Sequence, residues 1–160
     1  MKTQRIIQIT LTFILSIFAT GCASSISTMS ENDRNQAYAD YIISEKLESL
    51  DRITTFRFDG FNALSDENVI ISTSFHKAYL ITLQYRCHNL RYANAIKVNK
   101  TGASLMAKFD SISAHSSSAQ GERCHIKTIH RITQEQKKAI QQIGRKDILE
   151  DEAKTEQEQA

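Results

Sequence analysis

From Ile53 onward, the apolar residues of this chain recur at every second position, in short runs that turn-forming residues separate. The clearest run is Tyr79–Tyr85, in which the odd-numbered positions are apolar and Thr82 and Gln84 lie on the opposite side. A period of two is that of a β-strand with one buried face. Six such strands, with turns every eight to twelve residues, predict one small antiparallel sheet that curls into a barrel or a sandwich.

A helix is predicted on each side of this sheet, which makes the fold class mainly β with flanking helices (α+β). Before the strands, apolar residues at helical spacing predict a helix over about residues 36–50, and the candidate caps in front of it are Ser30, with Asp33, and Asn32. After the strands, Thr133-Gln134-Glu135-Gln136 is a capping box that opens a second, short helix, and a glycine follows its last turn.

The first 21 residues have the pattern of an export signal. Lys2 and Arg5 precede a largely apolar run of 14 residues, 6–19, which is too short to span a bilayer comfortably as a helix. Two cleavage sites fit the residues that follow. Ala19-Thr20-Gly21 has the small residues of an ordinary signal peptidase site, and Ala19-Thr20-Gly21-Cys22 resembles a bacterial lipobox with Ala where Leu is usual.

The number of cysteines favours the lipobox. The chain has three, Cys22, Cys87 and Cys124, and an odd number would leave a free thiol in an oxidising compartment. A diacylglyceryl group on Cys22 removes that thiol and, with two or more acyl chains, holds a protein stably on a bilayer. Ala23 after the cysteine resembles an outer-membrane sorting signal. We therefore expect a lipoprotein anchored in the outer membrane through Cys22 and facing the periplasm, with the inner membrane as the alternative.

Removal of the signal peptide changes the charge balance. Residues 1–21 contain Lys2 and Arg5 and no acidic residue, so 20 − 2 = 18 basic residues remain against 18 acidic ones. The mature chain then has no net charge, which gives no basis for a nucleic-acid partner. Four segments are predicted by composition. These are a lipoprotein signal peptide at 1–21, a flexible tether at 22–35, a single globular domain at 36–143 and a polar acidic tail at 144–160.

The two remaining cysteines have two interpretations. Cys87 and Cys124 each lie at the end of a predicted strand, and two such thiols are expected to form a disulfide in the periplasm. A histidine follows each cysteine, His88 and His125, so that two Cys and two His also form a possible zinc set. Neighbouring residues on a strand point to opposite faces, and the spacing lacks the gap that zinc ligands prefer. The disulfide is favoured, and no metal or cofactor is predicted.

Two short segments resemble each other and each contains a carboxylate. Each has a basic residue, Phe, Asp and a small residue in that order, in Arg57-Phe58-Asp59-Gly60 and in Lys108-Phe109-Asp110-Ser111. Asp59 and Asp110 are weak catalytic candidates, because two carboxylates brought together can act as general acid and base. The favoured interpretation is that each aspartate ends a strand by bonding backbone amides in a turn.

The chain resembles a family of uncharacterised proteobacterial lipoproteins, domain of unknown function family 6491. The stretches that carry the resemblance are, in order, "ITTFRFDGFNAL", "VIIST", "AYLITLQYRCHNLRYANAI", "FDSI" and "ERCHIKTIHRIT". Phe61 stands where the family usually has Trp, and Arg86 where Pro often precedes the first cysteine. The resemblance covers about residues 38–134. It implies a lipid-anchored, periplasm-facing domain with Cys87 paired to Cys124, and it implies no activity.

The function expected from these observations is that of a non-enzymatic module that binds an unknown envelope protein or supports the cell envelope. Two alternatives belong to other classes. One is an envelope hydrolase that uses Asp59 and Asp110. The other is a lipoprotein that inhibits lysozyme, although the serine-glycine and tyrosine-tryptophan signature of such inhibitors is missing and the chain has no Trp.

Overall fold

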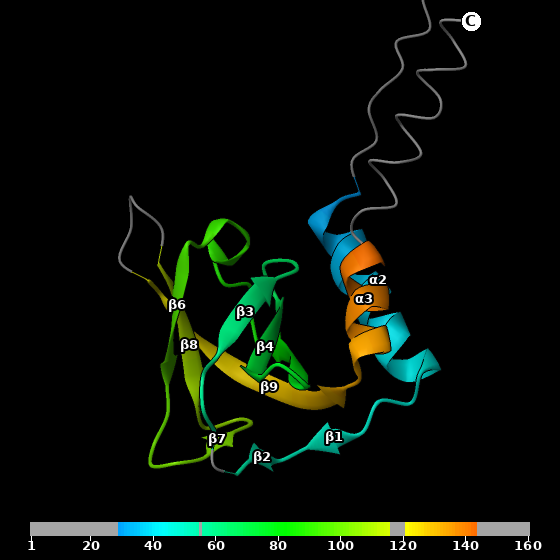
Figure 1. The fold of residues 1–160 in the computed structure, drawn as a ribbon. Helices are drawn as coiled ribbons and strands as arrows, with labels where there is room; N and C mark the ends of the chain where they lie inside the picture. The colour runs from blue at the N-terminus through cyan, green and yellow to red at the C-terminus, as the bar shows by residue number, and fades with distance from the viewer. Residues whose placement is uncertain (1–28, 55, 116–120, 144–160) are drawn as a thin grey trace, which may run out of the picture.

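The structure is a computed structural model that describes residues 29–54, 56–115 and 121–143. Seven strands form one antiparallel sheet that curls into a nearly closed barrel, and two helices lie on its outside (Figure 1). The helices are α2 (Glu31–Ser44) and α3 (Gln134–Ile143), with a 3-10 turn η1 at Leu90–Tyr92. The strands are β1 (Ser49–Leu50), β2 (Arg52–Ile53), β3 (Gly60–Ala63), β4 (Asn68–Ser74), β5 (Lys77–Leu83), β6 (Ala95–Asn99), β7 (Leu105–Met106), β8 (Ser111–His115) and β9 (Arg123–Ile132).

The long strand β9 holds the sheet together. The strands follow the order β3-β4-β5-β9-β8-β6, and β1 also pairs with β9, while β2 and β7 form a separate two-stranded ribbon. The first residues of β9 pair with β8, as in Ile112 opposite Cys124, and its last residues pair with β1, as in Ser49 opposite His130. Strand β5 pairs with β9 over most of its length.

A bulge in β9 changes which residues face the inside of the barrel. Thr82 of β5 lies opposite Thr128, but the next residue, Leu83, lies opposite Ile126, so Lys127 is an extra residue in β9. Ile126 and Ile129 therefore both belong to the inner core although they are three positions apart. As a consequence, Thr128 and His130 face outward, toward helix α2.

The central strands β4 and β5 are buried on both faces over most of their length. The inner core fills the barrel, and a second core lies between the outer face and the two helices. Neighbouring residues of β5 belong to different cores. Ile81 is part of the inner core and Leu80 of the outer one, and neither has any exposed area. The prediction that residues 79–85 form a half-buried strand is therefore wrong for the outer face, because α2 and α3 cover it.

Both helices begin with the predicted caps. The Ser30 hydroxyl oxygen accepts a hydrogen bond from the Asp33 backbone N–H at 3.2 Å, and α2 starts at once. Residues 31–35, placed in the tether by composition, are therefore helical. The capping box of α3 is complete, since Gln136 N–H donates to Thr133 Oγ1 at 3.1 Å and Thr133 N–H donates to Gln136 Oε1 at 2.9 Å.

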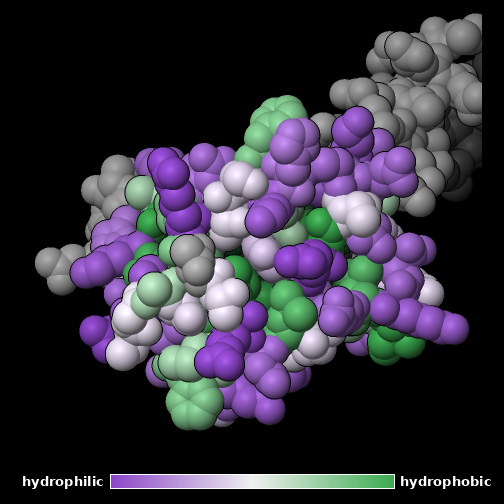
Figure 2. Space-filling model, turned by 60° about the horizontal axis from the view of Figure 1, so that its bottom comes forward, coloured by the Kyte–Doolittle hydropathy of each residue, from purple (hydrophilic) through white to green (hydrophobic). Residues whose placement is uncertain are grey.

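Several aromatic residues lie on the surface, and others are buried in the barrel. Tyr85 and Tyr92 are 72% and 73% exposed and Phe58 is 41% exposed, whereas Phe56 and Tyr79 belong to the inner core. Residues 57–59 form no strand. Figure 2 shows one face of the molecule, on which apolar residues reach the surface at separate places among polar ones.

The predicted signal peptide at 1–21, the lipidation site Cys22 and the tail at 144–160 lie outside the described residues. Among the residues that the structure describes, no helix is long and apolar enough to cross a membrane.

Candidate functional site

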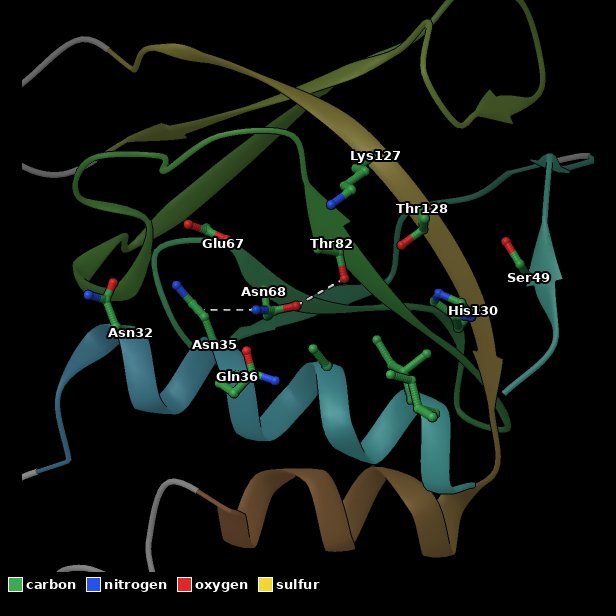
Figure 3. Close-up of a pocket in the computed structure, with 13 residues that line it drawn as sticks. Asn32, Asn35, Gln36, Ser49, Glu67, Asn68, Thr82, Lys127, Thr128 and His130 are labelled. Carbon is green, nitrogen blue, oxygen red and sulfur yellow. Dashed lines mark hydrogen bonds between the residues drawn. The ribbon is translucent and has the colours of Figure 1, made fainter. Parts of the chain in front are cut away.

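A cleft of about 710 Å³ lies between helix α2 and the outer face of the sheet (Figure 3). One wall is the side of α2 that does not contact α3, and the floor is formed by β4, β5 and β9. Strand β1 closes one end with Ser49. Thirteen residues line the cleft: Asn32, Asn35, Gln36, Ala39, Ile42, Ile43, Ser49, Glu67, Asn68, Thr82, Lys127, Thr128 and His130.

The floor of the cleft is organised around Asn68, which is only 3% exposed. Its side-chain oxygen accepts a hydrogen bond from Thr82 Oγ1 at 3.0 Å, and its amide nitrogen donates to Asn35 Oδ1 at 3.2 Å and to Ser65 Oγ at 3.2 Å. Asn35 in turn donates from Nδ2 to Asp66 Oδ1 at 2.9 Å. These bonds connect β4, β5 and α2, so the side chains of the floor are held in fixed orientations.

His130 lies at the other end of the floor and is 6% exposed. Its Nδ1 lies 3.3 Å from the backbone oxygen of Leu47, and because a carbonyl oxygen only accepts, Nδ1 carries the hydrogen. The hydroxyl of Thr128 lies two residues earlier on the same side of β9 and also lines the cleft. Within the described residues, no hydrogen bond joins His130 to Thr128 or to Thr82.

Charge is scarce in the cleft. Glu67 and Lys127 are its charged residues at neutral pH, and the Glu67 carboxylate lies 3.8 Å from the guanidinium of Arg86. Arg86 is also 3.3 Å from Asp66, so this rim forms an ion-pair group of its own. At the opposite end, α2 presents Ile42 and Ile43, and Ile43 is 73% exposed.

The two sequence-predicted cysteines are together. Cys87 and Cys124 lie at disulfide distance, with Cα atoms 5.6 Å apart, and both side chains are part of the inner core. His88 and His125, the neighbours that formed the alternative zinc set, are exposed instead. In the described part of the chain, no three His, Cys, Asp or Glu side chains are grouped so that they could hold a metal ion.

The two aspartates that were weak catalytic candidates have different surroundings. Asp110 is 4% exposed, and its Oδ2 accepts a hydrogen bond from the Met106 backbone N–H at 2.7 Å. That carboxylate closes the turn between β7 and β8. Asp59 is exposed, and its backbone N–H donates to Ser72 O at 2.9 Å. No hydrogen bond or ion pair between the two appears among the described residues, and neither lines the cleft.

None of the polar residues of the cleft was predicted from the sequence as a functional residue. The sequence did contain one sign of the cleft, the polar residue Thr82 between apolar residues of β5. In the structure, Thr82 lies opposite Thr128 of β9. The sequence did not show that helix α2 lies over both threonines, because that contact joins segments about 40 residues apart or more.

The sequence profile of one family, described as "Family of unknown function (DUF6491)", matches residues 4–147. Searches of curated proteins and of solved structures found no match.

Proposed function

Since the chain belongs to the family of unknown function DUF6491, whose description names no activity, we propose its function from the cleft. It is a non-enzymatic binding module of the cell envelope. A lipid on Cys22 anchors it in the outer membrane, facing the periplasm, and the cleft between α2 and the sheet holds an extended segment of another envelope protein.

The observation that carries this proposal is the chemistry of the cleft lining. Seven of the thirteen residues are uncharged and polar, with amide or hydroxyl side chains: Asn32, Asn35, Gln36, Ser49, Asn68, Thr82 and Thr128. Such groups both donate and accept hydrogen bonds, as the peptide groups of a chain do. Ile42 and Ile43 add an apolar end that a side chain of the partner can contact. Pockets that bind ligands combine such apolar contacts with a few placed polar groups.

A sugar ligand fits this lining less well than a polypeptide. The apolar face of a sugar ring packs well on a flat aromatic side chain, which supplies a large contact area. None of the thirteen residues of the cleft is Phe, Tyr or Trp. The polypeptide is therefore the favoured ligand.

The cleft also lacks the arrangement of a hydrolase. A nucleophile and its base lie within hydrogen-bonding reach of each other, and a glycosidase needs two carboxylates. Among the described residues that line the cleft, His130 makes no hydrogen bond to either threonine and Glu67 is the single carboxylate. The alternative pair, Asp59 and Asp110, is disfavoured because the Asp110 carboxylate is buried against the Met106 backbone amide.

The anchor is supported by the sequence around Cys22 and by the cysteine pairing. With Cys87 and Cys124 at disulfide distance, Cys22 is the remaining cysteine of the chain. The test is Cys22→Ser in the full-length protein, expressed in its own cell type and followed by membrane fractionation. We expect the wild type to stay with carbonate-washed membranes and to show the mass of an acylated N-terminal cysteine. A wild type with an unmodified N-terminus would refute the anchor.

The cleft is tested by photo-crosslinking in intact cells. A photoreactive amino acid is placed at Gln36 or at Ile43, both in the cleft, and at Phe75, which is 84% exposed and outside it. We expect the two cleft positions to give the same protein adduct and the control position not to give it.

A second variant shows whether that adduct depends on the cleft. Ala39 lines the cleft and is exposed on α2, so Ala39→Trp fills the cleft without disturbing a core. Lys138→Trp, at an exposed position of α3, is the matched control. The adduct should disappear with Ala39→Trp and persist with Lys138→Trp. An adduct that survives Ala39→Trp would refute the proposed use of the cleft.

A further inference from the structure

A second, smaller pocket lies on the other side of α2, and it differs from the cleft in its charge. It has a volume of about 270 Å³ and is bounded by α2, β3, η1 and α3. Five of the residues that line it are polar: Arg34, Tyr38, Asn62, Arg91 and Gln141. Two of the five are arginines, and no carboxylate lines the pocket.

Arg34 is an unusual residue for this position. It is 6% exposed, and its Nε is the buried side-chain nitrogen that finds no hydrogen-bond partner within the described residues. Its ion pair with Glu31 is long, with Glu31 Oε1 3.8 Å from that nitrogen. A buried cation is costly unless it is paired and hydrogen-bonded, so the side chain retains a capacity to pair with an anion.

Glu31 is shared among several groups. Its Oε1 pairs with Arg91 Nη1, and its Oε2 accepts a hydrogen bond from the Asp66 backbone N–H at 3.3 Å. Two guanidinium groups thus meet a single carboxylate, which leaves one positive charge in excess at the pocket. Glu31 is in the first turn of α2 and is not among the residues that line the pocket.

The other polar groups of the pocket are able to donate hydrogen bonds. Tyr38 is 1% exposed, and burial raises the pKa of its phenol, against the weaker opposing effect of the Arg34 charge. The phenol therefore keeps its proton at neutral pH. Asn62 of β3 and Gln141 of α3 each present an amide NH₂ group. The donors come from three different elements, which fixes their relative positions.

We propose that this pocket binds an oxyanion, a phosphate or carboxylate group, between Arg34 and Arg91. The planar guanidinium fork matches the two oxygens of either group, and charge-assisted hydrogen bonds are stronger than neutral ones. The volume holds several waters or one such anion, since a water occupies about 30 Å³. This site is separate from the cleft and does not depend on the function proposed for it.

The test is calorimetric titration of the detergent-solubilised full-length protein with inorganic phosphate and, separately, with acetate, at constant ionic strength set by sodium chloride. Saturable binding of either anion by the wild type supports the site. The anion that binds more tightly shows whether the site prefers a phosphate or a carboxylate group. An absence of saturable binding of both anions would overturn the proposal.

Four variants locate the binding. Arg91→Gln removes one of the two guanidinium groups and should weaken anion binding at least tenfold. Gln141→Glu brings a carboxylate into the pocket, where it pairs with Arg34, and should abolish binding while leaving the fold intact. Glu31→Gln removes the competing charge and should strengthen binding several-fold. Arg86→Gln removes an arginine of the cleft rim and should leave anion binding unchanged. An equal loss in Arg86→Gln and Arg91→Gln would show nonspecific attraction and overturn the site.

Discussion

Asn68 shows at the scale of one residue how a polar side chain is accommodated in a nearly buried position at the floor of the cleft. It is 3% exposed and bonds to Thr82, Asn35 and Ser65, so every one of these bonds is lost if its amide is removed. A buried donor or acceptor without a partner costs about 1–3 kcal/mol.

We predict that Asn68→Ala lowers the free energy of unfolding by about 1–3 kcal/mol, because it leaves Thr82 and Asn35 without their partner. Urea unfolding followed by circular dichroism measures the change. Asn94→Ala, at an exposed position, is the control and should change the free energy little. Equal stability of the two variants would mean that the network around Asn68 adds nothing to the fold.

Tyr38 gives a prediction about how the free energy of unfolding depends on pH. Burial raises the pKa of its phenol above the ordinary value of 10.0, and Tyr41 is shifted in the same direction by burial and by the Glu45 charge. Above about pH 10, the unfolded state therefore loses these protons before the folded state does. The free energy of unfolding is unaffected by these groups below that pH and falls as the pH rises through and above it.

The measurement is the free energy of unfolding in urea at several pH values between about 8 and about 11. Tyr38→Phe has no phenol to titrate, so the alkaline fall should become shallower, and the residual slope belongs in part to Tyr41. Tyr85→Phe is the matched control, since Tyr85 is 72% exposed. A slope that is the same in Tyr38→Phe and in the wild type would contradict the assigned cause.

At the scale of single elements, the sequence predicted best where local chemistry decides. The caps Ser30 and Thr133 were predicted because capping depends on residues three positions apart along the chain. Most of strand β5, Lys77–Leu83, was predicted because the apolar residues alternate clearly over Tyr79–Tyr85.

Elements that depend on distant contacts were missed. Strand β8 was not predicted, because Ser111 and Ser113 are buried between β6 and β9, where packing rather than propensity places them. The bulge at Lys127 was missed for the same reason, since only the pairing with β5 reveals it. The polar cleft could not be predicted, because it exists only where α2 lies over Thr82 and Thr128.

The capping box of α3 gives the prediction at this scale. Thr133→Ala removes the hydroxyl that accepts the Gln136 N–H, and the loss of a side-chain N-cap costs about 1 kcal/mol. We expect that decrease in the free energy of unfolding, with α3 still formed in the folded protein. Thr101→Ala, at an exposed turn position, should be neutral. A Thr133→Ala variant as stable as Thr101→Ala would show that the rest of α3 suffices to start the helix.

At the scale of the whole molecule, the two cysteines at disulfide distance join parts of the chain that are far apart in sequence. Cys87 follows β5 and Cys124 lies in β9, with a sequence separation of 37 residues that includes β6, β7 and β8. The pair therefore fixes one half of the barrel relative to the other.

We predict that breaking this pair lowers the free energy of unfolding by about 4 kcal/mol, from the chain entropy that a loop of this length removes from the unfolded state. The variant is Cys87→Ala with Cys124→Ala, compared with the wild type in urea with and without reductant. Reductant should destabilise the wild type alone. A wild type that is insensitive to reductant, with both thiols open to alkylation, would contradict the disulfide.

The early start of helix α2 has a consequence for which molecules the protein can meet. Glu31 is only nine residues after Cys22, and an extended chain covers about 3.5 Å per residue, so at most about 32 Å separates Cys22 from the first turn of the helix. Both the cleft and the arginine pocket begin within that first turn or the next. With the lipid that we propose on Cys22, whatever occupies them has to come within a few nanometres of the bilayer, which favours other membrane-attached molecules over freely diffusing ones.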